Sequence, residues 1–449
     1  MPAVHLRSRH FHYGFLMAFT GALLILSSHG FGRFAYSMIL PPMREGLGLD
    51  YTQTGLLATG NFVGYLVASL VAGLVATRVG VRRAALAGLV LVGSSMAVTG
   101  LATGFAFPLL ARTATGIGSA FVNVAALGLA AAWFAPPRRG LATGITVGGS
   151  GVGVTLSGIL VPAIVLAYGS QGWRYAWYCL GAAILAVTAV AYLILRERPS
   201  QMGLLPFGAA GEGQEQSAAV RPDWRGVYAL PALWRCGLIY LAFGTSYVVA
   251  ATFFAAYLTA EVGLSTVEAG RLWATAGFIS IFSPALFGVI SDSIGRSRGL
   301  AAAFLLMTAS LIIFAGNLGV TSAQVATVLF GLSVWPIPAL IAATTGDMVG
   351  PRLTPAAIGF VTVLFSLGQA IGPAVGGYVA DTTGSFAPAL GVSALVAFAG
   401  ALGSLSLAKP SAVHSLLPSP PQQDVRAATP LQGADTEGSP SEALAQRDP

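Results

Sequence analysis

The sequence GLVATRVGVRR at residues 73–83 returns in recognisable form as GVISDSIGRSR at residues 288–298, an offset of 215 residues. The same offset places Gly144 on Gly359 and Gly153 on Gly368. One register therefore relates several separate points of the chain. Similarity at a fixed offset predicts a duplicated chain, in which one architecture is built twice.

The composition of the chain is strongly apolar. Hydrophobic residues make up 55% of the 449 positions, charged residues only 9%, and the mean hydropathy is +0.76. These values exclude an ordinary soluble globule and indicate a polytopic membrane protein. Backbone polar groups in hydrocarbon must be satisfied within the segment, and the period-2 alternation of barrel strands is absent, so we expect helices.

A spanning helix needs about 20 mostly apolar residues, and the sequence accommodates twelve such segments. The fold class that we predict is therefore an all-α membrane protein of two pseudo-symmetric six-helix halves. The predicted helices cover residues 14–40, 53–76, 84–103, 106–133, 141–167 and 174–195, and then 234–259, 267–291, 299–316, 322–346, 356–380 and 386–408.

The helices divide the chain into five parts. The two halves cover residues 14–195 and 234–408. Residues 196–233, which are polar and rich in Gly and Pro, are expected to be a cytoplasmic linker between them. Residues 1–13 form a cytoplasmic N-terminus that leads into the first retained helix. Residues 409–449 have no periodic apolar face, so we expect a disordered cytoplasmic tail.

The net charge of +7 reflects topology rather than nucleic-acid binding, so no nucleic-acid partner is expected. Of the 23 basic residues, only Arg44, Arg174 and Arg271 fall in predicted outer segments, and Arg33 and Arg112 fall inside helices. The remainder gather on one side. The positive-inside rule therefore predicts that both termini are cytoplasmic. The two cysteines imply neither a disulfide nor a metal site.

The repeated loop follows the second helix of each half and resembles the G-x-x-x-D-R-x-G-R-R motif of the major facilitator superfamily. In that family the acidic residue and the arginines form an inter-helix charge network that holds one access state. The resemblance assigns this gating role to Asp292, Arg296 and Arg298. The other reading is that these arginines only fix the membrane orientation.

The first copy of the loop departs from the motif, because Thr77 stands where the acid is expected, and we expect a weaker latch there. The glycines of both copies have separate roles: those near the helix ends allow close packing and those in the turns allow a tight bend. The remaining expected gating residues are Gly73, Arg78, Gly80, Arg82, Arg83, Gly288 and Gly295.

A second match is RTATGIG at residues 112–118, which resembles the R-x-x-x-G-x-G pattern of the superfamily's fourth helix. An arginine inside a spanning segment costs several kcal/mol unless it faces protein or water, so Arg112 is a functional candidate. The alternative is a structural arginine bonded to backbone carbonyls. The Gly-rich fifth helix of each half, with Gly144, Gly148, Gly368 and Gly372, is expected to serve helix packing and bending.

The first helix carries SSHGFGRFAYSMILPPM at residues 27–43. His29, Arg33 and Tyr36 are spaced i, i+4 and i+7, which is one face of an α-helix. In the superfamily the first and fourth helices line the central cavity, so the resemblance implies that Arg33 and Arg112 face one chamber. The G-x-G-R-F-x-Y pattern is also similar to a bacterial branch of that superfamily, which places the chain in the inner membrane.

The predicted helices contain no Asp or Glu near their middle, so the two buried arginines lack acidic partners. Either amide oxygens such as those of Asn61, Asn123 and Gln369 accommodate them, or a bound anion completes the site. A guanidinium matches a carboxylate or phosphate, which favours a small organic anion such as a monocarboxylate. His29 is the candidate for proton coupling, with a packing histidine as the alternative.

These observations predict a secondary active transporter that works by alternating access, acts as a monomer in the lipid bilayer and has protons as the possible coupling ion. No P-loop, nucleophile motif or metal cluster occurs, so neither an enzyme nor a cofactor is expected. One alternative is a proton-coupled drug or metabolite exporter. An alternative of another class is a membrane sensor with a transporter-like fold that signals through its linker or tail.

Overall fold

The computed structural model describes residues 12–209 and 230–407. These residues are helical, apart from loops and an isolated bridge between Phe134 and Phe207. Eleven helical segments are long and apolar enough to cross a membrane, and one of them, Pro136–Ile194, contains two helices joined by a short turn. The described chain therefore provides the twelve predicted spans.

The helices of the first bundle are α1 (Tyr13–Ile25), the π-helix η1 (Leu26–Phe34), α2 (Tyr36–Leu47), α3 (Tyr51–Val79), α4 (Val81–Thr99), α5 (Ala106–Trp133), α6 (Arg139–Tyr168) and α7 (Gly172–Ile194). Those of the second bundle are α9 (Pro231–Ala260), α10 (Thr266–Ile294), α11 (Arg296–Gly316), α12 (Val320–Ser333), α13 (Pro336–Thr383) and α14 (Ala387–Leu405).

Two spans consist of more than one element. The first span joins α1, η1 and α2 and continues through Pro41 and Pro42 to Leu47, beyond the predicted end at residue 40. It stops where Gly48 adopts a φ of 64°, a left-handed helix cap. Helix α13 is broken at Gly350, where φ is 72°, so its first part completes the tenth span and its second part is the eleventh.

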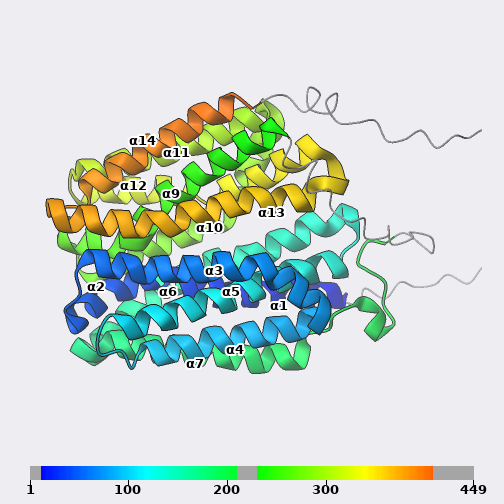
Figure 1. Ribbon diagram of the computed structural model, residues 1–449, viewed down its shortest axis with the longest axis horizontal. Coiled ribbons are helices and arrows are strands. Elements are labelled where there is room, and N and C mark those ends of the chain that lie inside the picture. The colour runs from blue at the N-terminus through cyan, green and yellow to red at the C-terminus, as the bar shows by residue number, and fades with distance from the viewer. Residues whose placement is uncertain (1–11, 210–229, 408–449) are drawn as a thin grey trace, which may run out of the picture.

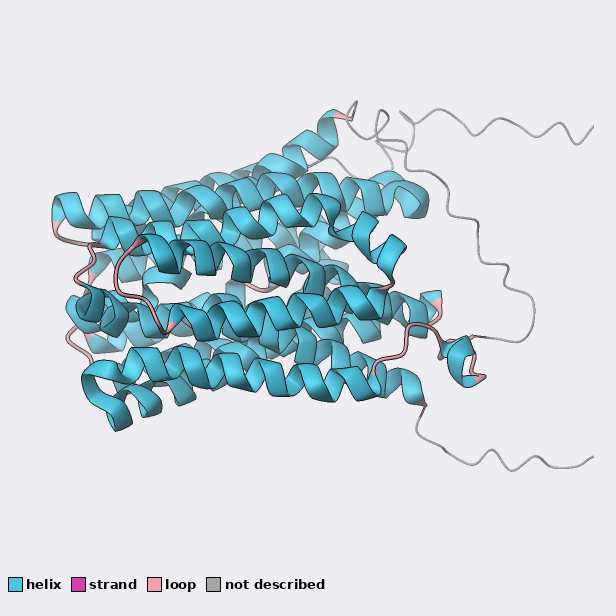
Figure 2. Ribbon diagram, turned by 60° about the horizontal axis from the view of Figure 1, so that its bottom comes forward, coloured by secondary structure: helices cyan, strands magenta, loops and turns pink. Residues whose placement is uncertain are grey.

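The two bundles lie side by side, with α1–α7 in the lower part of Figure 1 and α9–α14 in the upper part. All helices run roughly along the long axis, and Figure 2 shows that helix dominates throughout. We call the end that carries the turns at Gly80 and Gly295 the motif face, which lies to the right in Figure 1. The other end, which carries the turns between α2 and α3 and between α13 and α14, is the closed face.

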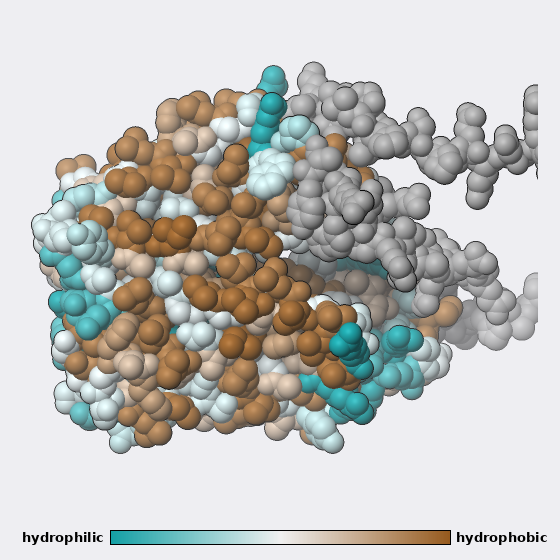
Figure 3. Space-filling model, in the orientation of Figure 1, coloured by the Kyte–Doolittle hydropathy of each residue, from teal (hydrophilic) through white to brown (hydrophobic). Residues whose placement is uncertain are grey.

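Apolar side chains cover the flanks of the molecule, and the most polar residues gather toward its two ends (Figure 3). Leu110, Leu193, Val289 and Leu395 are each at least 70% exposed, which would be costly in water. This distribution fits a protein whose flanks face lipid acyl chains.

The ends of α3 and α10 reproduce the internal repeat in detail. Asp50 and Ser265, which are related by the offset of 215, each cap the helix that follows by accepting a hydrogen bond from the third backbone N–H. Gly80 and Gly295 end these helices with φ/ψ of 95°/144° and 94°/147°. The tight turns expected at both glycines are therefore present, with matching geometry.

The structure also describes part of the predicted linker. A short 3-10 helix covers Pro199–Met202. Phe207 exchanges backbone hydrogen bonds with Trp133 and Ala135, at 2.9 and 3.0 Å, so this stretch is attached to the end of α5. The rest of the linker, the first eleven residues and the predicted tail lie outside the described residues.

Gly295→Ala is expected to lower the apparent melting temperature of the detergent-solubilised protein. Its φ of 94° lies in a region that is almost exclusive to glycine, and a side chain there costs about 1–3 kcal/mol. Gly288→Ala is the matched control, since it lies within α10 with open space around its missing Cβ. Equal melting temperatures for the two variants would contradict the role of Gly295 in the turn.

Candidate functional site

A cavity lies between the two bundles and contains both arginines that the sequence places inside helices. The first bundle contributes side chains from the first, second and fourth spans, and the second bundle contributes a stretch of α9. The lining residues are Arg33, Phe34, Tyr36, Ser37, Ala58, Phe62, Arg112, Val248, Ala251 and Thr252.

The first span changes from an α-helix to a π-helix at Leu26–Phe34, the segment that carries His29 and Arg33. Gly30 lies so close to α6 that an added Cβ would be 2.5 Å from the Cα of Gly153. Helix α5 bonds to the same segment, since Ser119 Oγ donates to the Ser28 carbonyl at 3.2 Å. Widened turns of this kind often occur at functional sites. The apolar pattern of this span predicts an ordinary α-helix, and the run of Gly and Ser at residues 27–32 was the available signal for a different geometry.

Arg33 is buried in the first bundle, with 7% of its surface exposed. Its Nε and Nη2 atoms have no hydrogen-bond partner among the described residues. The guanidinium lies over the ring of Tyr65 at 4.3 Å from its centroid and 5.0 Å from that of Phe62. Aromatic faces partly compensate the charge, but unpaired donors remain beside the cavity.

Arg112 is also buried, with 1% exposed, and lies between the rings of Tyr36 and Trp177 at 4.7 and 5.3 Å from their centroids. Its Nη1 donates to the Gly32 carbonyl at 2.5 Å, whereas its Nε has no partner in the described part of the chain. Arg112 therefore joins α5 to η1 through a backbone carbonyl, as the structural alternative requires, and still lines the cavity.

The three predicted amide residues do not contact the guanidinium groups. Asn61 Nδ2 donates to the backbone carbonyl of Arg112 at 3.1 Å. Asn123 Nδ2 donates to Tyr65 Oη at 2.8 Å, and Gln369 Nε2 donates to Tyr247 Oη. In this structure the amide nitrogens of these residues are hydrogen-bonded elsewhere, and none of their oxygens is hydrogen-bonded to a guanidinium group.

His29, Arg33 and Tyr36 do not have the same neighbours, although Arg33 and Tyr36 line the same cavity. The His29 ring lies 5.9 Å from that of Tyr65, which also contacts Arg33. Tyr36 instead packs 6.3 Å from the Trp177 ring, and its Oη donates to the Thr54 carbonyl at 2.8 Å. The π-helix has more residues per turn than an α-helix, so it changes the direction of the side chains that follow.

The two bundles contact each other closely in the parts of the helices near the closed face. An added Cβ on Gly55 of α3 would lie 2.2 Å from the Pro373 carbonyl oxygen of α13, and one on Gly158 of α6 would lie 2.5 Å from the Gly270 carbonyl oxygen of α10. Trp273 Nε1 also donates to Ser157 Oγ at 3.2 Å. Glycines permit this approach of helix backbones.

Asp381 closes the interface at the closed face. Its carboxylate accepts from the backbone N–H groups of Tyr51 and Thr52, at 2.9 and 2.6 Å, and from Thr52 Oγ1 at 2.6 Å. These N–H groups begin α3, where a helix carries partial positive charge. A carboxylate of the second bundle thus caps a helix of the first.

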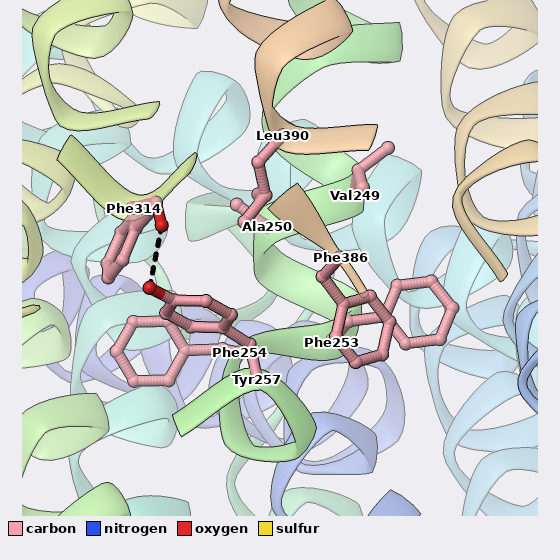
Figure 4. Close-up of a pocket in the computed structure, with 8 residues that line it drawn as sticks. All are labelled: Val249, Ala250, Phe253, Phe254, Tyr257, Phe314, Phe386 and Leu390. Carbon is pink, nitrogen blue, oxygen red and sulfur yellow. Dashed lines mark hydrogen bonds between the residues drawn. The ribbon is translucent and has the colours of Figure 1, made fainter. Parts of the chain in front are cut away.

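The ring of Tyr51 strengthens the same contact. It packs 4.8 Å from Phe386 and 6.3 Å from Phe253, both of the second bundle. These two phenylalanines also line a second, small cavity inside that bundle (Figure 4). Its lining is apolar, and the Tyr257 hydroxyl points away from it to donate to the Phe314 carbonyl at 2.6 Å. The side chains that line this second cavity serve hydrophobic packing, and none of them carries a charge that could bind an anion.

The motif face differs from the closed face in how closely its helices pack. Gly73 lies 18 residues, or about five turns, beyond Gly55 on the same face of α3, and Gly288 lies equally far beyond Gly270 on α10. An added Cβ on Gly73 or Gly288 would meet no heavy atom of the described residues within 4 Å. The close packing expected at these two glycines is therefore absent from this structure.

The glycines of the fifth helix of each half, α6 and the second part of α13, differ in how closely they are packed. Gly368 and Gly372 pack closely against α9, as expected. Gly144 and Gly148 meet no heavy atom of the described chain within 4 Å. Close packing of α6 is made instead by Gly149 and Gly153, nearer the closed face.

The second copy of the loop motif forms a charge network within its own bundle. Arg296 pairs with Asp292 at 2.6 Å and with Asp347 at 3.2 Å, and it donates to Ser291 Oγ at 2.6 Å. The network links α10, α11 and α13. Arg298 lies in the first turn of α11 and is exposed.

The first copy of the loop is paired differently. Arg82 donates to the Tyr192 carbonyl at 2.6 Å, and its backbone N–H donates to Glu197 Oε1 at 3.3 Å. The acid in this loop is therefore supplied by the linker, while Arg78 and Arg83 are exposed.

Twelve spans in two bundles, with a buried basic cavity between them, define a transporter of the major facilitator superfamily. The family described as "Uncharacterised MFS-type transporter YbfB" matches residues 25–405, and the chain belongs to this family. It is therefore a membrane transporter of small solutes and not an enzyme.

Two relatives and one solved structure show similarity over most of the chain. The probable sulfoacetate transporter SauU of Cupriavidus necator is 24% identical over 395 residues, 83% of this chain and 89% of SauU. The hexuronate transporter of Bacillus subtilis is 23% identical over 399 residues, 84% and 91% of the two chains. A bacterial homologue of the human lysosomal transporter Spinster, crystallised inward-facing and unoccupied, shares the fold, with a TM-score of 0.68, 18% identity and coverage of 90% and 96%.

Asp381→Asn is expected to open the closed face, because an amide accepts from the α3 N–H groups without the charge that strengthens these bonds. The measurement is the labelling rate of Thr59→Cys by a membrane-impermeant maleimide, in a background without Cys179 and Cys236. Thr59 Oγ1 donates to the Ala370 carbonyl of the other bundle at 2.8 Å, so it reports on this interface. The expected change is an increase of about tenfold.

Asp50→Asn is the matched control for this experiment. Asp50 caps the same helix end from within the first bundle, by accepting from the Gln53 N–H at 2.6 Å. Faster labelling in both variants would mean that the effect comes from fraying of α3. In that case the contact between the bundles would not be responsible.

Proposed function

We propose that this transporter moves a small organic anion, with a monocarboxylate as the simplest example, across the inner membrane by alternating access. The observation that carries the proposal is the pair of buried arginines on one cavity. Every carboxylate among the described residues lies near a helix end. An anion would supply the acceptors that Arg33 Nε and Nη2 lack, and guanidinium groups match carboxylates in shape and charge.

The named substrates of the two relatives support this class. Sulfoacetate and hexuronate are both small organic anions. A cationic drug would require a membrane-embedded carboxylate, and the described helices offer none away from their ends. We propose proton coupling through His29, since it lies one turn before Arg33 and shares Tyr65 with it.

In this proposal the motif face is cytoplasmic and the structure is open to that side. The basic residues of the two loops, including Arg78, Arg82 and Arg298, lie at this face, and the positive-inside rule assigns such a face to the cytoplasm. The contrast between Gly55 and Gly73 on one face of α3 supports exchange between two states. When the motif face closes, Gly73 and Gly288 become the close contacts.

Arg33→Gln is expected to lower uptake of radiolabelled carboxylates into proteoliposomes by at least about tenfold, because a charged hydrogen-bond donor is removed. Arg112→Gln is expected to lower uptake and also stability, since the bond to Gly32 is lost. Arg174→Gln is the control: its Nη1 donates to the Gly100 carbonyl at 2.8 Å, away from the cavity. Unchanged anion transport in both cavity variants would refute the proposed binding site.

Gly73→Trp is expected to fold normally and to abolish transport. The present conformation has open space at this position, whereas the state closed at the motif face does not. Gly391→Trp is the control, because this helix position of α14 is open too and lies away from the interface between bundles. Melting temperature reports folding and solute counterflow reports transport; full counterflow in Gly73→Trp would contradict closure at this site.

A further inference from the structure

The second bundle contributes a cluster of uncharged polar side chains that the function above does not use. Tyr247 of α9 and Ser366 and Gln369 of α13 are each at least 97% buried. Gln369 Nε2 donates to Tyr247 Oη. Gln369 Oε1 and Ser366 Oγ have no hydrogen-bond partner among the described residues. Burial of unpaired polar atoms is costly, so this cluster needs an explanation.

The unpaired amide atom does not depend on how the Gln369 side chain is assigned. If its oxygen and nitrogen are exchanged, Tyr247 Oη donates to Gln369 Oε1, and Nε2 becomes the unpaired atom. Either way one amide atom and the Ser366 hydroxyl remain available. The cluster can therefore both donate and accept hydrogen bonds.

The cluster lies across the bundle interface from Arg33. Tyr65 and Tyr247 lie close enough to the Arg33 guanidinium for their phenols to interact with it electrostatically, as His29 and Arg112 also do. Val248, next to Tyr247 along α9, lines the cavity with Arg33. The carbonyl of Ala370, the residue after Gln369, accepts from Thr59 of the first bundle at 2.8 Å.

Neighbouring aromatic rings fix the direction of Tyr247. Phe243 is stacked 4.6 Å from its ring at an interplanar angle of 10°, and Phe365 lies at 6.2 Å and 9°. The hydroxyl of Tyr247 is thereby held in one place. A fixed donor gives geometric selectivity at lower entropic cost than a mobile one.

We propose that Tyr247, Ser366 and Gln369 form a subsite for a hydroxyl group, so that the transported anion is a hydroxycarboxylate. This assignment rests on the proposed anion transport. Arg33 takes the carboxylate, and the uncharged cluster takes the hydroxyl, which is both donor and acceptor. A second carboxylate would find no positive charge in this cluster. A plain alkyl chain would leave its buried polar atoms unpaired, which sites of this kind reject strongly.

The test compares anions that differ only in hydroxyl groups. The probes are glycolate and acetate, lactate and propionate, and tartrate and succinate, measured by counterflow in proteoliposomes. The wild type is expected to prefer a hydroxylated member by at least about tenfold. Gln369→Ala and Ser366→Ala are expected to lower transport of that member more than of its partner, which reduces the preference to about threefold or less.

Ser404→Ala is the matched control, because Ser404 is equally buried and donates to the Gly400 carbonyl at 2.7 Å within α14. It is expected to keep the wild-type preference. A measurement on the wild type alone guards against variants that fail to fold: the hydroxylated anion should raise the melting temperature more than its partner at equal concentration.

The outcomes separate this assignment from the proposed function. Anion transport that depends on Arg33 but shows no hydroxyl preference would overturn the hydroxyl subsite alone. A preference that survives in Gln369→Ala and Ser366→Ala would also overturn it. Transport of none of the six anions would overturn the proposed function, and the hydroxyl subsite with it.

Discussion

The burial of two guanidinium groups inside an apolar bundle is the constraint on which the site depends. Arg33 and Arg112 have no carboxylate partner in the described part of the chain. Their charge is balanced by the faces of aromatic rings and by the Gly32 carbonyl. Such partners are weaker than an ion pair, because a ring quadrupole or a single carbonyl attracts a cation less than a full negative charge does. The two guanidinium groups therefore retain the capacity to bind an anion.

The π-helix is what allows this arrangement to form. An ordinary α-helix bonds its own carbonyls internally, whereas the widened segment presents the Gly32 and Ser28 carbonyls to α5. Gly30 and Gly153 let α6 approach from another side. The segment is thus held by its neighbours rather than by its own propensity, and its shape is sensitive to the position of each.

The sequence predicted the elements whose causes are local. Hydropathy and the 215-residue offset gave the twelve helices, and the glycines of the loop gave the turns at Gly80 and Gly295. Features that depend on contacts between distant residues could not be predicted from the sequence. Two examples are the π-helix and the capping of α3 by Asp381, which both depend on tertiary packing. The expected packing of Gly73 failed for another reason. In the proposed transport cycle one sequence serves more than one conformation, and a pattern of small residues does not say which conformation uses it.

The interface between the bundles is built so that it can separate. Both ion pairs of the described chain lie within the second bundle, and none joins the two bundles. The contacts across the interface are instead close approaches of glycines, hydrogen bonds, and the packing of Tyr51 against Phe253 and Phe386. Glycine faces expose little apolar area when they part, and the α3 N–H groups that Asp381 releases lie at a helix end where water can bond them. If the transporter alternates between two states as proposed, opening this interface breaks no ion pair of the described residues, and the shift between the states is set by the difference in the solute's affinity for them.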